Sequence, residues 1–418
     1  MLGQRRPNGE FTEILLERAL AGAPISPPDR GLCHELVLGI VRWQAALDWL
    51  IARKTPGRTQ KPALQDLLRL GLYQIFWLDR IPGHAAVNET VEMAKRAGFG
   101  PQAGFINAVL RGCLREAEAT RRLLAELKTQ QPALGHSHPD WLFERWKNRW
   151  DGERATLLMA WNNTSPPTYA RVNTLRTDAA GLIEKWRGEG VDYDFFTRDW
   201  TGENMIFKLK SHPSLASLTS FRDGWFYLQD PSTLLAVREL DPQPGEAILD
   251  LCAAPGGKTT FIAQLVRNEA RIVACDVFED RLKLIRENCE RLGVTGVEMS
   301  SNLQSAIGNR QFDRVLVDAP CSNTGVMRRR ADLRWRIQPA EIERLRTAQL
   351  DLLRRAAVAL KPGGILVYST CSLEPEENSA VVRQFLAEHS GFKCEREREL
   401  LPFADGVDGA FVSRLRRV

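Results

Sequence analysis

At 418 residues the chain is long enough for two or three domains, each with its own hydrophobic core. Its content of 44% hydrophobic and 26% charged residues is ordinary for a soluble protein, and no apolar run approaches the ~18 residues of a membrane span. We therefore expect no membrane partner. The start, MLGQRRPNGE, lacks the apolar core of a signal peptide, so we expect a cytoplasmic protein.

Residues 11–127 show helical periodicity only. In ELVLGIVRWQAALDWLIAR the apolar residues lie on one stripe at helical spacing, and ALQDLLRLGLYQIFWL repeats the pattern. We therefore predict an all-α domain over 1–134. The segment 130–140, QQPALGHSHPD, is rich in turn-forming residues and predicts a linker. Its His136 and His138 have no third ligand nearby, so we expect no metal site.

The remainder of the chain shows two different patterns of predicted helices and strands. Residues 138–222 mix the helical WLFERWKNRW with the strand-like TYARVNTLRT, which predicts a small α+β module. From 223 to 418, short apolar strands such as AILDL, RIVAC, FDRVLVD and GILVYST alternate with helical stretches. This alternation predicts an α/β domain with a parallel, doubly wound, Rossmann-like sheet, in which ligands bind beyond the carboxyl ends of the strands.

The segment 250–260, DLCAAPGGKTT, has the form of a strand, a glycine-rich turn and a helix start, which is typical of a cofactor loop. A P-loop is excluded because Cys252 stands where its first glycine belongs, and GxGxxG is absent. S-adenosylmethionine is the third candidate, because its carboxylate can lie at a helix N-terminus. Its ribose needs an acid at the end of the next strand, and Asp276 lies 20 residues after Gly256, at the expected spacing.

Two further strands each lead into a cysteine, Cys321 in VLVDAPCSNTG and Cys371 in LVYSTCSLEPEEN. Parallel strands would bring both thiols to the cofactor edge. The eight cysteines include no CxxC pair, which argues against zinc ribbons and iron–sulfur clusters. Two thiols beside a methyl sulfonium suit methylation of a pyrimidine at carbon 5, because a thiolate added at carbon 6 makes carbon 5 nucleophilic.

Two charged residues have a place in this chemistry. Asp318 can hydrogen-bond the ring N3 and the exocyclic amine of the base, and the other interpretation is an ordinary turn acid. Lys258 can favour the thiolate form of Cys371, as can the arginine-rich segment after Cys321. The second thiol can then assist removal of the carbon-5 proton, as a base or through an ordered water.

The motifs DLCAAPGGKT, DAPCSNTG and STCSLEPEEN together resemble those of the RNA 5-methylcytosine methyltransferases. The resemblance covers nearly the whole chain and is specific for the bacterial small-subunit ribosomal RNA enzymes of the Fmu/Sun (RsmB) type. RGLCHELVLGIVRW and GFINAVLRGCL are similar to the NusB-like RNA-binding domain of that family. The resemblance implies a NusB-like domain at 1–134, an RNA-binding or linker module at 138–222 and a methyltransferase domain at 223–418.

The resemblance also implies roles for single residues. Cys371 is the nucleophile and Cys321 assists release, although the Pro-Cys thiol of DNA cytosine methyltransferases would nominate Cys321 instead. Asn302 stands where many relatives carry an acid that contacts the adenine amine. The implied catalytic residues are Cys371, Cys321, Asp318 and Lys258, and the implied cofactor contacts are Cys252, Ala253, Ala254, Pro255, Gly256, Gly257, Lys258, Asp276, Arg281, Asn302 and Asp318.

The expected substrate is a specific cytosine of 16S ribosomal RNA, free or in the assembling small subunit, and the expected protein is a monomer. We expect the arginines of MRRRADLRWR (327–336) and of the closing SRLRR to hold phosphates, with Trp335 stacking on a base. The other interpretation places Trp335 in a core and leaves these arginines solvated. Two alternatives for the function stay open: a tRNA cytosine methyltransferase, and a non-catalytic RNA-binding ribosome-assembly factor.

Overall fold

A computed structural model describes residues 10–418, so nine of the ten residues considered for a signal peptide lie outside the described part. The described chain forms two compact units. The helical unit consists of residues 10–165 and 327–336, and the sheet unit consists of 166–326 and 337–418. Within residues 10–418 there is no helix with the length and apolarity needed to cross a membrane.

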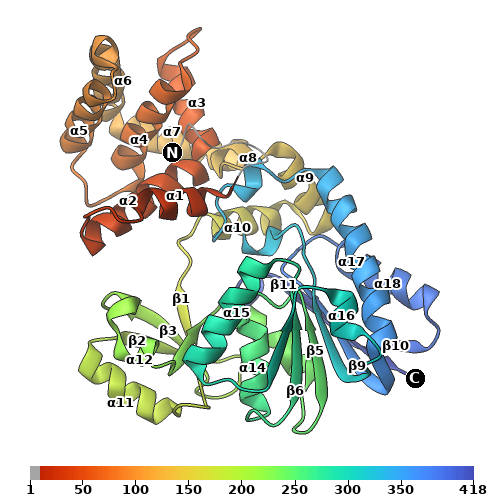
Figure 1. The fold of residues 1–418 in the computed structure, drawn as a ribbon. Helices are drawn as coiled ribbons and strands as arrows, with labels where there is room; N and C mark the ends of the chain where they lie inside the picture. The colour runs from red at the N-terminus through yellow and green to blue at the C-terminus, as the bar shows by residue number, and fades with distance from the viewer. Residues whose placement is uncertain (1–9) are drawn as a thin grey trace. The chain divides into compact units, whose positions relative to one another are not determined.

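The helical unit confirms the predicted all-α fold (Figure 1). Its second to sixth helices enclose one core that includes Leu47, Leu68, Leu72, Ile106 and Leu110, because each helix carries an apolar stripe. The helices are α1 (Thr12–Leu20), α2 (Pro27–Arg42), α3 (Gln44–Lys54), α4 (Pro62–Trp77), α5 (Gly83–Arg96), α6 (Ala103–Arg115), α7 (Ala117–Gln130), α8 (Pro132–Gly135), α9 (Asp140–Arg149) and α10 (Gly152–Asn162).

The predicted linker at 130–140 is wrong as a description of this segment. Helix α8 occupies its centre, and His136, Ser137 and His138 are all buried. The Ser137 hydroxyl accepts a hydrogen bond of 2.8 Å from the Ala45 backbone N–H. Burial lowers the pKa of His136 to about 4, so its ring is neutral near pH 7. Turn-forming residues here build a tight corner inside the helical unit.

The first part of the sheet unit is the predicted α+β module. Its four antiparallel strands lie in the order β2-β3-β1-β4. The indole of Trp186 on α11 packs edge-on against Phe207 and Phe226, with ring centroids 5.3 Å apart in both pairs. The elements are β1 (Thr168–Val172), α11 (Ala179–Glu189), β2 (Asp192–Phe196), β3 (Ile206–Ser211), α12 (Thr219–Arg222) and β4 (Phe226–Leu228).

The second part contains a seven-stranded sheet in the order β10-β11-β9-β8-β5-β6-β7. The five strands from β9 to β7 are parallel, as predicted, whereas β10 and β11 form an antiparallel pair at one edge. The strands are β5 (Ala247–Leu251), β6 (Arg271–Cys275), β7 (Val297–Ser300), β8 (Phe312–Asp318), β9 (Leu360–Thr370), β10 (Phe392–Leu400) and β11 (Ala410–Arg417).

Helices cover both faces of this sheet (Figure 1). Alternate strand residues point to opposite faces, so Ile248 packs with the helices of one face and Leu249 with those of the other. One face carries α13 (Leu234–Leu240), α14 (Gly257–Leu265) and α15 (Glu279–Leu292). The other carries α16 (Leu303–Ile307), α17 (Pro339–Ala359) and α18 (Ser379–Glu388), and the short α19 (Pro402–Asp405) precedes β11.

Candidate active site

Four neighbouring parallel strands bring the predicted site residues to one edge of the larger sheet. Strands β9, β8, β5 and β6 are adjacent and run in the same direction. Asp318 is the last residue of β8, while Asp276 directly follows β6 and Cys371 directly follows β9. The glycine turn follows β5. The carboxyl ends of the strands therefore collect the loop, the acids and the thiols, as the sequence predicted.

The turn between β5 and α14 requires glycine at two positions. Gly256 has φ of 96°, a left-handed conformation that favours glycine, and a Cβ at this position would lie 3.3 Å from Ile285. A Cβ on Gly257 would lie 3.1 Å from the ring of Tyr227. The turn is closed by a 2.8 Å hydrogen bond from the Gly256 N–H to the carbonyl of Ala253. Both glycines are therefore needed for close packing of the turn against Ile285 and Tyr227.

Asp276 is buried behind this turn. One carboxylate oxygen accepts from the Ala254 N–H at 3.3 Å and lies 3.2 Å from the Arg281 guanidinium. The other accepts from the Phe278 N–H at 3.3 Å. Arg281 also donates to the carbonyl of Ala254 at 2.9 Å, so it ties the turn to the acid. The oxygen that accepts from Phe278 keeps one lone pair for a hydroxyl donor.

Asn302 is an exposed residue that caps helix α16. Its side-chain oxygen accepts from the Ser305 N–H at 3.1 Å, which satisfies one of the unpaired donors of the first turn. The same oxygen retains one lone pair. Its contact with a cofactor stays a prediction.

Lys258 and Asp318 form an ion pair at the centre of the edge, with 2.6 Å between Nζ and Oδ2. The second oxygen of Asp318 accepts from the Ser369 hydroxyl at 2.8 Å. Burial opposes the charge of Lys258, but the attraction and hydrogen bond of Asp318 outweigh it and raise the pKa of the lysine. A negatively charged Cys371 sulfur would raise it further. A protonated lysine therefore lies within electrostatic range of that thiol.

Two other side chains near the end of β5, Cys252 and Asp250, have pKa values above those usual for their residue types. Burial, with the nearby acids, raises the pKa of the Cys252 thiol to about 12, so Cys252 is no nucleophile near pH 7. Burial also raises the pKa of Asp250 to about 7, although its hydrogen bond of 2.6 Å from the Thr259 hydroxyl opposes the shift. Cys252 therefore belongs to the loop lining and not to the reacting thiols.

The two thiols lie side by side, with 3.4 Å between their Sγ atoms. The hydrogen bond with Cys371, together with burial, raises the pKa of the Cys321 thiol well above its ordinary value. Cys321 therefore keeps its proton and is suited to donate to the sulfur of Cys371. This asymmetry favours Cys371 as the nucleophile of the pair.

Two residues of the site were not identified in the sequence analysis, although both lie in quoted motifs. Asn323 has a φ of 61° and links the two cysteine turns, because its amide nitrogen donates to the Cys321 backbone carbonyl at 2.7 Å and its oxygen accepts from the Cys371 thiol at 3.1 Å. An asparagine two residues after a strand-end cysteine is a recognisable signal, since asparagine tolerates left-handed backbone. Glu377 is fully buried among the serines that follow both cysteines.

The predicted phosphate contacts of residues 327–336 are wrong for Arg334. It is fully buried and donates to the carbonyls of Arg42 at 3.3 Å and Asn162 at 3.0 Å, and to the Asn163 side chain at 2.6 Å. Arg42 and Asn162 are the last residues of α2 and α10, whose end carbonyls have no intrahelical partners. Arg334 supplies those partners, and its charge suits the negative ends of two helices.

Three neighbours of Arg334 in this segment also make contacts within the helical unit. Trp335 is half-buried and donates its indole N–H to the carbonyl of Val41 at 2.8 Å. Stacking of a base on its ring stays a prediction. The guanidinium of Arg328 lies 4.2 Å from the ring centroid of Trp161, and that of Arg336 lies 4.3 Å from Phe11. These cation–π contacts are internal to the helical unit.

The closing arginines also have internal roles. Arg414 and Arg416 lie on β11, and both pair with Glu395 of the neighbouring strand β10. Arg417 donates to the carbonyl of Leu360. The cluster that suggested phosphate binding is therefore largely a set of cross-strand ion pairs.

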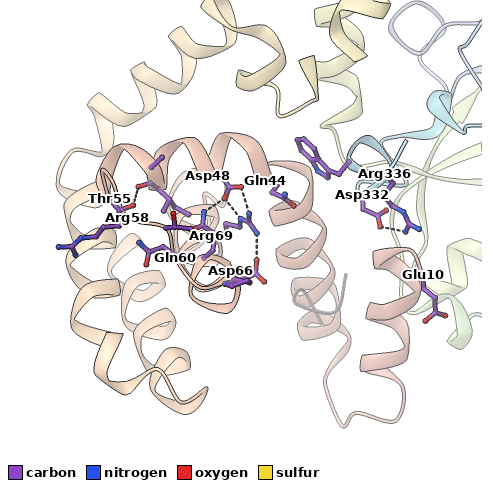
Figure 2. Close-up of a pocket in the computed structure, with 16 residues that line it drawn as sticks. Glu10, Gln44, Asp48, Thr55, Arg58, Gln60, Asp66, Arg69, Asp332 and Arg336 are labelled. Atoms are coloured by element: carbon purple, nitrogen blue, oxygen red, sulfur yellow. Dashed lines mark hydrogen bonds and ion pairs between the residues drawn. The ribbon is translucent and has the colours of Figure 1, made fainter. Parts of the chain in front are cut away.

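The helical unit contains a cavity of about 820 Å³, shown in Figure 2. Its lining includes four acids and three arginines, most of which pair with each other. Asp48 and Asp66 both accept from Arg69 at 2.7 Å, and Arg336 lies 3.4 Å from Asp332. The acids offset the arginines, so this cavity has no excess positive charge with which to hold phosphate.

Comparison with known proteins gives three matches to families along the chain. Residues 237–416 match the family of 16S rRNA methyltransferase RsmB/F, residues 4–115 match the NusB family, and residues 138–196 match the RsmF/B-like ferredoxin-like domain. The probable ribosomal RNA small subunit methyltransferase B of Bacillus subtilis is 34% identical over 433 aligned positions, which cover 98% of this chain and 95% of that protein.

Two solved structures are also similar. That of PH0851 has a TM-score of 0.77 and 26% sequence identity, covering 96% of this chain and 93% of the other. That of NSun6 from Pyrococcus horikoshii with SFG, an analogue of S-adenosylmethionine, has a TM-score of 0.59 and 25% identity, covering 67% of this chain and 98% of the other. The similarity therefore includes both units and the strand-end edge.

Proposed function

Since this chain belongs to the 16S rRNA methyltransferase RsmB/F family and uses S-adenosylmethionine, we propose that it methylates carbon 5 of a specific cytosine. The observation that carries the proposal is the pair of thiols 3.4 Å apart beside the ion pair of Lys258 and Asp318. A carbon-5 reaction needs a nucleophile for carbon 6 and a second group for the carbon-5 proton. This edge of the sheet supplies both.

The cofactor edge has the chemistry that S-adenosylmethionine requires. One oxygen of Asp276 keeps a lone pair for a ribose hydroxyl, and the N-terminus of α14 can receive the carboxylate of the amino-acid end. Val277 and Phe278 are exposed apolar side chains directly after Asp276, where they can cover an adenine ring. The residues proposed to hold the cofactor are Cys252, Ala253, Ala254, Pro255, Gly256, Gly257, Lys258, Asp276, Arg281, Asn302 and Asp318.

In the first step the Cys371 sulfur bonds to carbon 6 of the cytosine. As the sulfur adds, N3 takes up the proton that the Cys371 thiol releases, so Asp318 can accept from N3–H and from the exocyclic amine. The protonated Lys258 beside it offsets the negative charge that develops during the addition. Cys321 donates to the Cys371 sulfur, which stabilises its thiolate before the attack. Bound S-adenosylmethionine supplies the methyl group as an electrophile.

In the second step the carbon-5 proton leaves and the base is released. A water held by the Cys321 thiol takes this proton, or Cys321 takes it after first releasing its own proton to solvent, and N3 gives its proton back to solvent. The electron pair of the carbon–hydrogen bond re-forms the double bond between carbons 5 and 6, and Cys371 departs as a thiolate. Asn323 bonds to the Cys371 sulfur and to the backbone carbonyl of Cys321, so it links the two turns during the exchange.

The other parts of the chain are proposed to bind RNA. The boundaries 1–134, 138–222 and 223–418 stay predictions for a NusB-like domain, a linker or RNA-binding module and a catalytic domain. The target cytosine must be unpaired or flipped out of a helix to reach Cys371, which costs a few kcal/mol. We propose 16S rRNA, free or in the assembling small subunit, as the substrate and a monomer as the active form.

The test is methyl transfer from labelled S-adenosylmethionine to three substrates: 16S rRNA, isolated small subunits and a tRNA pool. We expect label in 16S rRNA or its subunit, with bisulfite sequencing locating one cytosine that resists conversion. Label in tRNA alone would support the tRNA alternative. Label on an exocyclic nitrogen would overturn the carbon-5 proposal, and no transfer to any substrate would favour a non-catalytic assembly factor.

A further inference from the structure

Glu377 is a buried carboxylate to which the mechanism above assigns no part. It is fully buried, as are Ser372 and Gln349, and Ser322 is nearly so. One of its oxygens accepts from the Ser322 backbone N–H at 2.8 Å and from the Gln349 side chain at 3.0 Å. The other accepts from the Ser372 hydroxyl at 2.5 Å and from the Ser322 hydroxyl. Four donors from three segments converge on this one group.

The two serines are the residues that directly follow the two thiols. Ser322 follows Cys321 after β8, and Ser372 follows Cys371 after β9. Their hydroxyls also lie 3.0 Å from each other. Gln349 extends the network, because its amide donates at 2.9 Å to the carbonyl of Pro320, the residue before Cys321. Glu377 therefore fixes the Cys321 turn after the cysteine through Ser322 and before it through Gln349. It fixes the Cys371 turn after the cysteine, through Ser372.

We propose that Glu377 is the positioning residue that sets the distance between the two thiols, by bonding to the serine that follows each of them. The sulfur atoms need a fixed separation because they act in sequence on adjacent carbons of one ring. Parallel strands alone do not supply it, since the cysteines lie in turns after the strands end. Bonds from a carboxylate are stronger than those between neutral groups, and burial protects them from competition by water.

The consequence is a specific defect when Glu377 is lost. A displacement of the thiols by about 1 Å is expected to slow the chemical step about 100-fold. Binding of RNA and of S-adenosylmethionine is expected to be unchanged, because Glu377 bonds to the turns and not to the cofactor loop. The glutamine variant keeps one acceptor oxygen and the side-chain shape, so it should retain more activity than the alanine variant.

This inference rests on the proposed function for its kinetic readout, so the test includes a readout of thiol distance that needs no RNA. Oxidised glutathione forms a mixed disulfide with one thiol and releases one glutathione, and the second thiol then displaces the other glutathione to leave a protein disulfide. The sulfur atoms, 3.4 Å apart, need to approach by only about 1.4 Å to bond. Cys33 and Cys394 are replaced by serine in all variants to limit side reactions.

The experiment compares the parent with Glu377→Ala, Glu377→Gln and the control Val381→Ala, a buried apolar change on the adjacent helix α18. Peptide mass spectrometry measures the rate of the Cys321–Cys371 disulfide. We expect Glu377→Ala to form this disulfide about tenfold more slowly than the parent. Glu377→Gln should have an intermediate rate, and the control should not change.

Kinetics complete the test, with kcat expected to fall and KM for RNA to stay constant in Glu377→Ala. An unchanged disulfide rate, or a rate lowered equally in Val381→Ala at similar thermal stability, would overturn the positioning role. If the parent chain forms the disulfide rapidly but methylates no RNA, the proposed function fails while the role of Glu377 in holding the thiols is still measured.

Discussion

Strand β8 leads into two successive segments, 318–325 and 327–336, which differ in composition and in the unit to which they belong. Residues 318–325 have one charged side chain, Asp318, and form part of the reactive edge. Residues 327–336 have five arginines and one tryptophan, yet they pack within the helical unit. The first segment has little that suggests RNA chemistry by composition, and the second has much.

The difference teaches that position in the fold carries more information than residue type. Groups that follow parallel strands are brought together by the sheet, whatever their number. Arginines outside such a frame can satisfy helix ends as well as phosphates, because both present oxygen acceptors. Substitutions in the two segments should therefore separate the chemical role of the first segment and its partners from the structural role of the second.

The largest effect is expected at the thiols. Cys371→Ala should lower methyl transfer at least ~10⁴-fold, because the nucleophile is lost. Cys321→Ala should instead accumulate a covalent RNA adduct, since the base can be attacked but not released. Denaturing gels with labelled 16S rRNA measure both outcomes. An adduct with Cys371→Ala and none with Cys321→Ala would exchange the two roles.

The next effect is expected at Lys258, the cation of the edge. Lys258→Met keeps the length of the side chain but removes the charge that Asp318 and the Cys371 thiolate face. We expect kcat to fall about 10²–10³-fold, the usual loss for one electrostatic contact to the reacting group. Single-turnover kinetics measure it, and the melting temperature serves as the control for folding. A change confined to KM for RNA would place Lys258 in binding instead.

A smaller effect, on stability and not on chemistry, is expected in the arginine segment. Arg334→Met should lower the free energy of unfolding of the helical unit by about 3 kcal/mol, because buried carbonyls at two helix ends lose their donors. Denaturant titration monitored by circular dichroism measures the loss. Unchanged stability with weaker RNA binding would restore the phosphate interpretation for this residue.

The smallest effect is expected for Arg329, the matched control in the same segment. Its side chain is half-buried, in contrast to that of Arg334. Arg329→Ala should change the free energy of unfolding by no more than about 1 kcal/mol. If it destabilises the chain as much as Arg334→Met, burial is not what distinguishes the two arginines.

The sequence allowed most of the sheet and its edge to be predicted. Four parallel strands, the glycine turn, Asp276 and both thiols follow from short motifs because each is local and is read in one stretch of chain. Glu377 and Asn323 were not predicted, because their roles depend on contacts between the turns after β8 and β9, which are far apart in the sequence. The antiparallel strands β10 and β11 were missed because charged residues such as those of REREL obscure the strand pattern.

The position of residues 327–336 in the helical unit affects how a shortened chain should be designed. The chain leaves the sheet unit six residues after Cys321, contributes ten residues to the helical unit and returns at 337. A shortened protein that begins at 166 would therefore keep Met327, Ala331 and Leu333, apolar side chains that lie buried in the folded chain, without the helices that surround them. Expressing the sheet unit by itself therefore calls for a short replacement loop between 326 and 337.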